Sequence, residues 1–260
     1  MSGQGALVGR TALVTGASSG IGRAIALRLA EAGALVWASD VTEAVVEGGA
    51  PVIEPLRRLS PQSRFALLDV RDAGASAALM SQIAAAHGRL DIVVPNAMVP
   101  GGKGLPETDM AEWRRVTEVN LTGVYTTLHA ALRQMLGQPL RDEERGRMVI
   151  IGSQHGMIAS PNSFAYGVSK AAVLQMNRQI AADHAADGII CNAVSPGKIL
   201  TGKTGAAVSP EAMAYSAART PMPRLGAPSD VAEAVLFLAN PQTRFVCGHN
   251  LLVDGGWMAA

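Results

Sequence analysis

Cysteine, aromatic residues and charge are all scarce in this sequence. The 260 residues include two cysteines, Cys191 and Cys247, too few for the disulfide framework of a small secreted domain. Both stand in apolar, strand-like surroundings, so we expect buried structural thiols. Charged residues make up 17%, and 22 basic residues against 21 acidic ones leave a net charge of +1. This balance provides no basic surface for a phosphate backbone and argues against nucleic acid as a partner.

Long apolar runs are missing as well. No stretch reaches the roughly 20 residues that a helix needs to cross a membrane, and residues 1–10 lack the pattern of a signal peptide. We therefore expect a cytoplasmic protein without membrane association. Hydrophobic residues nevertheless make up 48%, which excludes a disordered chain. The length would permit two small domains, but it suits a single domain over residues 1–260 better.

Short β-rich apolar runs alternate along the chain with Ala-rich stretches of helical periodicity. The predicted strands are Thr11–Thr15, Leu35–Ser39, Arg64–Asp69, Asp91–Val94, Met148–Ile151, Ile189–Val194 and Asn250–Val253. The predicted helices are Gly20–Ala32, Ala73–His87, Met110–Leu136, Phe164–Asp187 and Ser229–Ala239, with a short one beginning near Pro51. This alternation predicts a single-domain, doubly wound (Rossmann) α/β fold, in which a seven-stranded parallel sheet carries helices on both faces.

The segment from Gly197 to Pro228 is long and rich in Gly and Pro, with a short helical candidate at Pro210–Ala218. It directly follows a strand end, where ligands bind in open α/β sheets. Long irregular segments in compact domains are often lids. We expect a substrate lid at about residues 198–220, and a tolerated surface insertion is the weaker alternative.

A glycine-rich turn links the first strand to the first helix. Three glycines at this position allow backbone amides to approach a pyrophosphate, and the dipole of the helix favours the anion. A plain strand-to-helix turn is the alternative. The candidate cofactor-binding residues of the turn are Gly16, Ser18, Ser19, Gly20, Ile21 and Gly22.

Asp40 ends the second strand, 24 residues after Gly16. A carboxylate here can accept hydrogen bonds from the hydroxyls of the adenosine ribose, and it would repel a 2′-phosphate. No Arg or Lys stands at positions 17–19, 41 or 42 to neutralise such a phosphate. The sequence therefore favours NAD over NADP as the cofactor.

Tyr166 and Lys170 lie four residues apart at the start of a predicted helix and so share one helix face. Free tyrosine has a pKa of about 10, too high for a base at neutral pH, and a nearby ammonium together with the positive nicotinamide ring favours the phenolate. Such a pair alone is weak evidence, because it is common on ordinary helix faces. Ser153 strengthens it, because it follows the strand Met148–Ile151 and can emerge at the same edge of the sheet.

The order and spacing of the glycine turn, Asn120, Ser153, Tyr166 and Lys170 resemble those of the short-chain dehydrogenase/reductase family, over nearly the whole chain. The resemblance implies that Tyr166 takes the proton from a substrate hydroxyl and that Ser153 orients and polarises the oxygen. It also implies that Lys170 holds the nicotinamide ribose and tunes Tyr166, while Asn120 holds a relay water. A structural kink is the other interpretation of Asn120, a costly buried amide inside an apolar helix, and both can hold.

The resemblance implies further cofactor contacts, and the chain departs from the family pattern at one place. The implied contacts are Asp69 and Val70 beside the adenine, Asn96 and Ala97 after the fourth strand, and Pro196, Gly197, Ile199 and Thr201 near the nicotinamide amide. Where the family usually has Asn-Asn-Ala-Gly, this chain has Pro95-Asn96-Ala97-Met98. We expect a locally altered loop and a reshaped pocket there, without loss of cofactor binding.

Substrate contacts are expected from Ser153, Gln154, His155 and Tyr166, and no metal site is expected. The hydrogen-bonding groups of Gln154 and His155 suit a sugar, a polyol or another small hydroxy compound, although a loop histidine satisfied by solvent explains His155 equally well. A 3-oxoacyl thioester reductase is the alternative enzyme, and a non-catalytic dinucleotide sensor the alternative of another class. The family also implies a homotetramer, assembled through the helices Met110–Leu136 and Phe164–Asp187 and the carboxyl-terminal strand.

Overall fold

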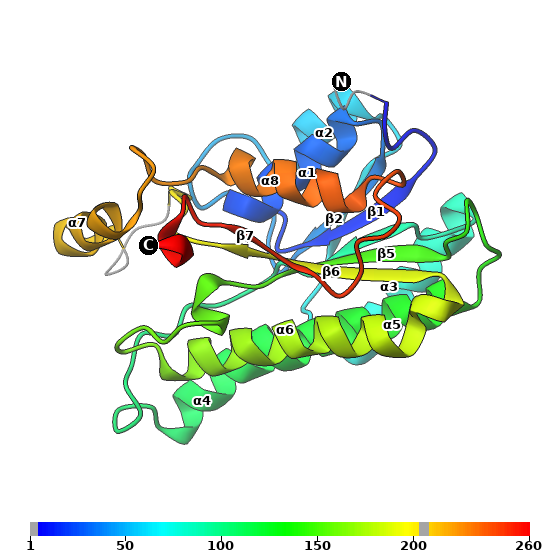
Figure 1. Ribbon diagram of the computed structural model, residues 1–260. Helices are drawn as coiled ribbons and strands as arrows, with labels where there is room; N and C mark the ends of the chain where they lie inside the picture. Colours follow the sequence, from blue (N-terminus) through cyan, green and yellow to red (C-terminus); the bar gives the residue numbers. More distant parts are fainter. Residues whose placement is uncertain (1–4, 203–207) are drawn as a thin grey trace.

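A parallel sheet of seven strands runs through the protein in the order β3-β2-β1-β4-β5-β6-β7 (Figure 1). The computed structural model describes residues 5–202 and 208–260. The strands are β1 (Thr11–Thr15), β2 (Leu35–Asp40), β3 (Arg64–Leu67), β4 (Ile92–Val94), β5 (Gly146–Ile151), β6 (Ile189–Pro196) and β7 (Asn250–Val253). The predicted doubly wound fold is confirmed, because each strand pairs in parallel with its neighbours.

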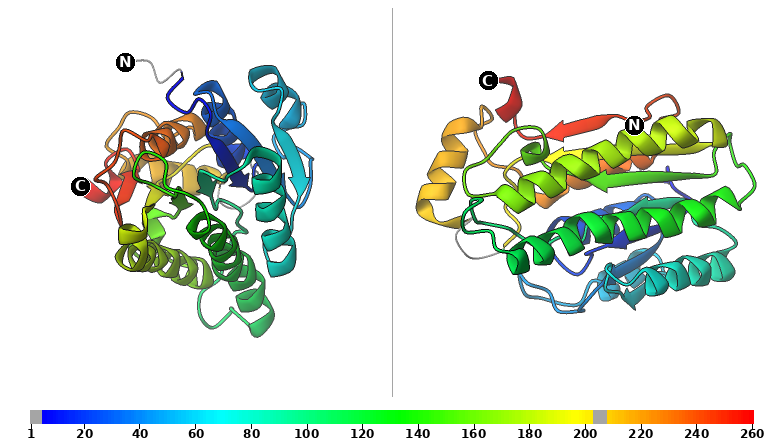
Figure 2. Two further views of the ribbon diagram at one scale, coloured as in Figure 1. Left: turned by 90° about the vertical axis from the view of Figure 1, so that its right-hand side faces the viewer. Right: turned by 90° about the horizontal axis from the view of Figure 1, so that it is seen from below.

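Helices cover both faces of the sheet (Figure 1). One layer contains α1 (Gly20–Glu31), α2 (Ile53–Leu59) and α8 (Pro228–Ala239). The other contains α3 (Ala73–His87), α4 (Met110–Thr117), α5 (Gly123–Leu136) and α6 (Phe164–His184). Figure 2 shows from below how α5 and α6 extend along the strands. A further helix, α7 (Pro210–Arg219), projects beyond the carboxyl edge of the sheet.

Alternate residues of each central strand enter two separate hydrophobic cores. Val14 packs in the core under α1 and α8, whereas its neighbour Leu13 packs in the core under α3, α5 and α6. All residues of β1 and β5 are buried. This two-sided burial explains why the strands appear in the sequence as nearly uninterrupted apolar runs.

The predicted helix Met110–Leu136 is interrupted, contrary to the expectation of one continuous helix. A π-helical turn, Glu118–Thr122, separates α4 from α5. The buried side chain of Asn120 lies in this turn and pairs with the backbone of Val99, with Oδ1 accepting from the amide at 2.8 Å and Nδ2 donating to the carbonyl at 2.9 Å. The kink interpretation of Asn120 therefore agrees with the structure.

The expectation for the cysteines is half right. Cys191 is completely buried within β6, but Cys247 is exposed in the loop that precedes β7. The apolar residues around Cys247 suggested a strand, whereas the strand begins only at Asn250. Within residues 5–202 and 208–260, no helix is long and apolar enough to cross a membrane.

The order of the strands reverses at β1, which pairs with β2 on one side and β4 on the other. In doubly wound sheets, ligands bind at the carboxyl ends of the strands next to this reversal. Thr15, Asp40 and Pro196 end their strands at this edge, and Asn96 and Ser153 lie just beyond it. The topology thus brings most of the residues selected from the sequence to one edge of the sheet.

Candidate active site

The glycine turn after β1 depends on glycine for two different reasons. Gly16 and Gly20 have φ angles of +63° and +54°, in the left-handed region that side chains disfavour. A Cβ atom at Gly22 would lie 2.1 Å from the carbonyl oxygen of Gly16, so only glycine lets α1 begin this close to the turn. The result is a helix N-terminus directed at a tight backbone loop, an arrangement that suits a dinucleotide phosphate.

Asn96 fastens this turn to the end of β4. Its Nδ2 donates to the carbonyl oxygens of Thr15 and Gly16, each at 3.0 Å. The backbone amides of Asn96 and Ala97 donate to the hydroxyl of Thr15 at 3.0 and 3.2 Å. Pro95 lacks an amide, but its carbonyl still accepts from Ile151 at 3.1 Å. These contacts give Asn96 a positioning role in the structure.

Asp40 lies beside the turn, as the sequence predicts. The half-buried carboxylate accepts hydrogen bonds from the backbone amides of Ser18 at 3.1 Å and Val41 at 2.7 Å. The remaining lone pairs can accept ribose hydroxyls, because each carboxylate oxygen accepts more than one bond.

Glu47 is a site residue that the sequence did not reveal. Its Oε1 accepts from the backbone amide of Gly20, the first residue of α1, at 2.8 Å. The segment that carries Glu47 is held down by two more bonds, from the Val46 amide to the Ser19 hydroxyl at 2.7 Å and from the Ser18 hydroxyl to the Thr42 carbonyl. A carboxylate of the chain itself thus occupies part of the anion-binding N-terminus of the helix. No periodicity or motif in this loop could have indicated it.

Ser153, Tyr166 and Lys170 come together at the carboxyl end of β5. The Ser153 hydroxyl forms a hydrogen bond with the side chain of Tyr166, and Lys170 Nζ lies 5.8 Å from the centroid of the Tyr166 ring. Ser153 and Lys170 are 7% and 2% exposed. Lys170 Nζ also donates to the carbonyl oxygen of Ile151 at 2.9 Å. The arrangement can take up or release a proton on the phenol oxygen of Tyr166, which is half-buried next to two buried polar groups.

Burial controls the protonation of this cluster. It raises the pKa of Tyr166, and the hydrogen bond from Ser153 acts in the opposite direction. Burial also lowers the pKa of Lys170 to about 8. The sequence led us to expect that Lys170 and the positive nicotinamide ring together favour the phenolate, whereas within the protein burial has the largest influence on the phenol. A low phenol pKa therefore requires further positive charge, which an oxidised nicotinamide would supply.

The two residues after Ser153 differ in their contacts: Gln154 is buried, whereas His155 lies against Tyr166. Gln154 is 4% exposed and packs beside Gly197, and its Oε1 has no hydrogen-bond partner among the described residues. The His155 ring stands edge-on to the Tyr166 ring, with centroids 6.3 Å apart. Burial, and then the charge of Lys198, lower the pKa of His155, so the imidazole is neutral at pH 7. His155 thus borders the phenol, as a substrate-contacting residue should.

The remaining predicted cofactor contacts divide into two groups. Thr201 lies against Gly20, and Ile199 forms a bridge with Gly226, so the chain from Pro196 to Thr201 crosses from the end of β6 to the glycine turn. Asp69 and Val70, which we expect beside the adenine, follow β3 and have contacts of their own. Arg71 pairs with the Asp69 carboxylate at 2.6 Å and lowers its pKa, and Val70 is buried against Gly123.

The expected lid is described only in part. Its helix, α7, runs from Pro210 to Arg219, close to the predicted Pro210–Ala218. The chain before it is joined to the body by hydrogen bonds between Leu200 and Gly226 and between Gly226 and Lys198, at 2.8 and 3.0 Å. Residues 203–207, which also belong to the predicted lid, lie outside the described residues.

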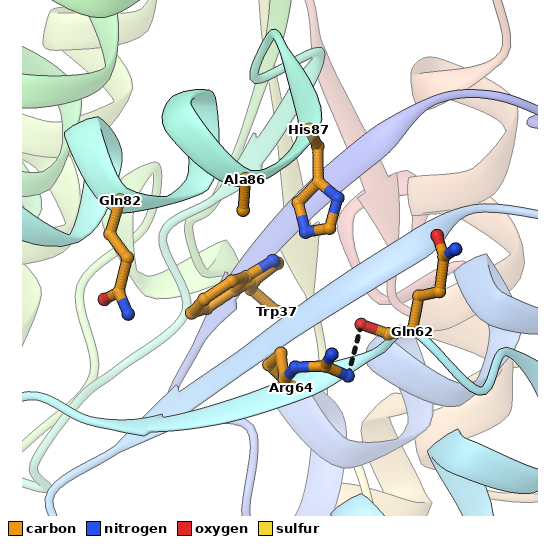
Figure 3. Close-up of a pocket in the computed structure, with 6 residues that line it drawn as sticks. All are labelled: Trp37, Gln62, Arg64, Gln82, Ala86 and His87. Carbon is orange, nitrogen blue, oxygen red and sulfur yellow. Dashed lines mark hydrogen bonds between the residues drawn. The ribbon is translucent and has the colours of Figure 1, made fainter.

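A cavity of about 440 Å³ lies elsewhere, between β2, β3 and the end of α3 (Figure 3). It is lined by Trp37, Gln62, Arg64, Gln82, Ala86 and His87. Its volume exceeds that of the pocket of about 140 Å³ beside His155, but it contains no pair of groups arranged for proton transfer. Chemistry rather than volume therefore identifies the active site. In the described parts of the chain, no three His, Cys, Asp or Glu residues are grouped as metal ligands.

Because the ammonium of Lys170 is buried, we expect that replacing this lysine with an uncharged residue raises the free energy of unfolding. A pKa lowered from 10.5 to about 8 corresponds to a cost of about 3 kcal/mol at pH 7, where the lysine is charged in both the folded and unfolded states. Lys170→Met removes this cost, although the Ile151 carbonyl loses its donor, at a cost of about 1–2 kcal/mol. We expect the variant to be about 1–2 kcal/mol more stable than the unmodified protein at pH 7, measured by urea unfolding.

The pH dependence provides a second readout. Between pH 8 and 10.5 the unfolded chain binds more protons at Lys170 than the folded chain, so the stability of the unmodified protein rises with pH and the advantage of the variant shrinks. Lys103→Met replaces an exposed lysine and should show neither effect. The account of the buried charge would be contradicted if Lys170→Met were less stable than the unmodified protein at pH 7, and less stable by the same margin at pH 10.

Comparison with known proteins also indicates a dehydrogenase or reductase site. Residues 16–258 match the family model described as enoyl-(acyl carrier protein) reductase. The chain is 42% identical to cis-4-hydroxycyclohexanecarboxylate dehydrogenase of Sinomonas cyclohexanicum, over 96% of this chain and 97% of the relative. It is 36% identical to 2-keto-3-deoxy-L-fuconate dehydrogenase of Xanthomonas campestris, over 96% and 81%. A 3-oxoacyl-[acyl-carrier-protein] reductase of Vibrio harveyi is 35% identical, over 96% and 98%.

Solved structures share the fold over almost their full length. A crystal structure from Sinorhizobium meliloti, described as a short-chain alcohol dehydrogenase, has a TM-score of 0.88 and 34% identity, and covers 98% of each chain. One described as an NAD(P)-dependent gluconate 5-dehydrogenase from Beutenbergia cavernae, with NADP bound at low occupancy, has a TM-score of 0.86 and 34% identity, also over 98% of each chain. The fold, the site and these similarities together show that the chain belongs to the short-chain dehydrogenase/reductase family.

Proposed function

We propose that this protein transfers a hydride between NAD and the carbon of a secondary alcohol or ketone in a small hydroxy compound. Family membership makes it an oxidoreductase that binds a nicotinamide dinucleotide and acts on CH–OH groups. The observation that carries the proposal is the cluster of Ser153, Tyr166 and Lys170 at the carboxyl end of β5, in which Ser153 and Lys170 are buried. The alternative of a non-catalytic dinucleotide sensor leaves this cluster unexplained.

The proposed roles follow from the geometry of the cluster. When bound, the nicotinamide supplies the acceptor for the hydride. In the oxidation direction, Ser153 Oγ holds the substrate oxygen and Tyr166 Oη takes the proton from the substrate hydroxyl as the C–H bond gives up its hydride. Lys170 favours the phenolate by its positive charge, from a position 5.8 Å from the ring centroid. Asn120 acts as a positioning residue, because it holds Val99 in the loop that borders the site.

The preference for NAD rests on Asp40. Its carboxylate lies beside the glycine turn, and basic residues are absent from positions 17–19, 41 and 42. The further cofactor contacts that we propose lie along the chain from Pro196 to Thr201 and at Asn96 and Ala97, next to the same turn.

The relatives favour a sugar acid or a cyclic alcohol over a thioester. The dehydrogenases with 42% and 36% identity are named for a hydroxycyclohexanecarboxylate and a deoxy-sugar acid, and the 3-oxoacyl reductase follows at 35%. We propose a substrate of the first kind, contacted by Ser153, His155 and Tyr166. Gln154 is a less direct contact, because it is buried beside Gly197.

We also propose one domain, a lid over about residues 198–220, and a cytoplasmic homotetramer. Several large apolar side chains on the helices expected to form the interface are exposed, namely Met110, Tyr125, Leu136, Phe164 and Val168. Phe245, before β7, is also fully exposed. A protein that leaves such groups uncovered has surfaces suited to a second copy. Light scattering should give the mass of four chains, and the mass of one chain would exclude the assembly.

Tyr166→Phe tests the proposed chemistry. Without the phenol oxygen no group can take the substrate proton, so turnover should fall by at least about 100-fold while NADH binding is retained. Turnover is measured by the absorbance of reduced nicotinamide with cis-4-hydroxycyclohexanecarboxylate, its uncharged carboxamide, sugars, polyols and a 3-oxoacyl thioester. Near-normal rates in the variant would exclude Tyr166 as the acid/base.

Cofactor preference is tested by comparing NAD with NADP. Because the 2′-phosphate would face the Asp40 carboxylate, kcat/KM should be at least about 10-fold higher with NAD, and Asp40→Ala should reduce this preference. Glu43→Ala removes a nearby exposed carboxylate and should leave the preference unchanged. A preference for NADP in the unmodified protein would overturn the assignment of NAD.

Glu47→Gln should bind NADH more tightly, by roughly 2- to 5-fold, because the side chain at the N-terminus of α1 no longer repels the pyrophosphate. The affinity is read from the fluorescence of NADH on titration with protein. Glu43→Gln, in the same segment, is the matched control and should leave the affinity unchanged. Weaker binding by Glu47→Gln alone would mean that Glu47 supports the cofactor site rather than competing for it.

A further inference from the structure

The last residue of α7, Arg219, packs beside two aromatic rings that also contact each other. Its guanidinium carbon lies 5.7 Å from the centroid of the Tyr215 ring and 5.5 Å from that of Trp257, and the two rings are 5.8 Å apart. Among the described residues, no Asp or Glu forms an ion pair with Arg219, whereas Arg224 nearby pairs with Asp230 at 2.6 Å. The rings keep the cation in place without neutralising it.

Arg219 borders a small pocket of about 140 Å³. The pocket is lined by His155, Ile158, Ala159, Ser160, Tyr215, Arg219 and Trp257, and none of these residues is acidic. Because His155 is neutral at pH 7, Arg219 carries the full charge of the lining. Lys198 adds positive potential, since its charge lowers the pKa of His155. The pocket is therefore cationic and partly apolar.

His155 connects this pocket to the proposed catalytic group. Its ring forms part of the wall and also stands edge-on to Tyr166, with centroids 6.3 Å apart. Tyr166 itself does not line the pocket. Among the residues that line the pocket, His155 is the one in ring contact with Tyr166. We therefore expect a molecule that contacts both Arg219 and Tyr166 to extend past His155, with its two polar groups on different parts of the molecule.

We propose that Arg219 binds the carboxylate of the substrate, and that the substrate is a hydroxy acid whose hydroxyl is separated from the carboxylate by a ring or a short chain. This inference rests on the function proposed above. The planar guanidinium can form two parallel hydrogen bonds to a carboxylate, and the rings of Tyr215 and Trp257 keep it oriented for them. Ile158 and Ala159 offer apolar contacts for the middle of the substrate.

The position of Arg219 adds a consequence for the lid. Tyr215 and Arg219 belong to α7, whereas Trp257 and His155 belong to the body of the protein. A carboxylate bound by Arg219 therefore ties α7 to the site that contains Tyr166. On this proposal, acids with the hydroxyl on the carbon next to the carboxylate should be poorer substrates than acids with a ring or a short chain between the two groups.

Binding of an unreactive acid tests the inference separately from turnover. Cyclohexanecarboxylate, which has no hydroxyl to oxidise, is titrated by calorimetry into the NADH-saturated protein, and uncharged cyclohexanecarboxamide is titrated in parallel. We expect the carboxylate to bind more tightly than the amide. Arg219→Gln should weaken carboxylate binding by roughly 10- to 100-fold and leave amide binding unchanged. Arg219→Lys should recover part of the affinity, because it keeps the charge and loses the planar pair of donors.

Arg58→Gln is the control for net charge, since Arg58 is exposed on α2, far from α7. It should bind the carboxylate like the unmodified protein. Equal affinity for carboxylate and amide, or an Arg219→Gln protein that binds the carboxylate normally, would overturn the inference and show that Arg219 only packs against the rings. Failure of the proposed function is recognised differently, by the absence of turnover with every alcohol and ketone while cyclohexanecarboxylate still binds through Arg219.

Discussion

A buried ammonium that has no carboxylate partner among the described residues is the constraint on which the site depends. Lys170 is 2% exposed, and the hydrogen bond that holds Nζ at 2.9 Å goes to a neutral backbone carbonyl, that of Ile151. This carbonyl is available because β5 ends there and the chain turns toward Ser153. The start of α6 must then place Tyr166 against the same strand end. The fold thus keeps a charge that costs stability next to the phenol that is proposed to lose its proton. Active sites commonly contain such destabilising groups, whereas the rest of a core does not.

The polar groups at the carboxyl edge of the sheet are bonded largely to the protein itself. Asn120 is paired with Val99, Asn96 with the glycine turn, and the amide of Gly20 with the carboxylate of Glu47. The first two pairings fix loops that border the cofactor site, and a bound dinucleotide can leave them intact. The bond to Glu47 is different, because it places a negative charge at the helix N-terminus that would receive the pyrophosphate. At the proposed cofactor site, a pyrophosphate would therefore meet a negative side chain of the protein itself.

The fold could be predicted from the sequence because two-sided burial leaves a strong pattern. Every strand appeared as an apolar run, and the glycine turn, Ser153, Tyr166 and Lys170 had spacings that the topology brings to one edge. The π-helical turn at Asn120 could not be read in the same way, because its residues have ordinary helical periodicity and the cause is a side-chain pairing with Val99. Glu47 and Arg219 were missed for a similar reason. Glu47 contacts Gly20 from a loop where no period constrains the pattern, and Arg219 contacts Trp257, which lies 38 residues further along the chain.

The direction in which the pKa of Tyr166 is shifted could not be predicted from the sequence either. Spacing indicated that Lys170 would be near, but only the structure shows that burial outweighs the other effects on the phenol and shifts its pKa upward. The central claim is nevertheless simple: the carbon-bound hydrogen of an alcohol held at Tyr166 moves to the nicotinamide. Its most direct test is mass spectrometry of the cofactor after turnover of cis-4-hydroxycyclohexanecarboxylate carrying deuterium on the carbinol carbon. The account predicts one deuterium in each NADH formed, and reduced cofactor without deuterium would contradict it.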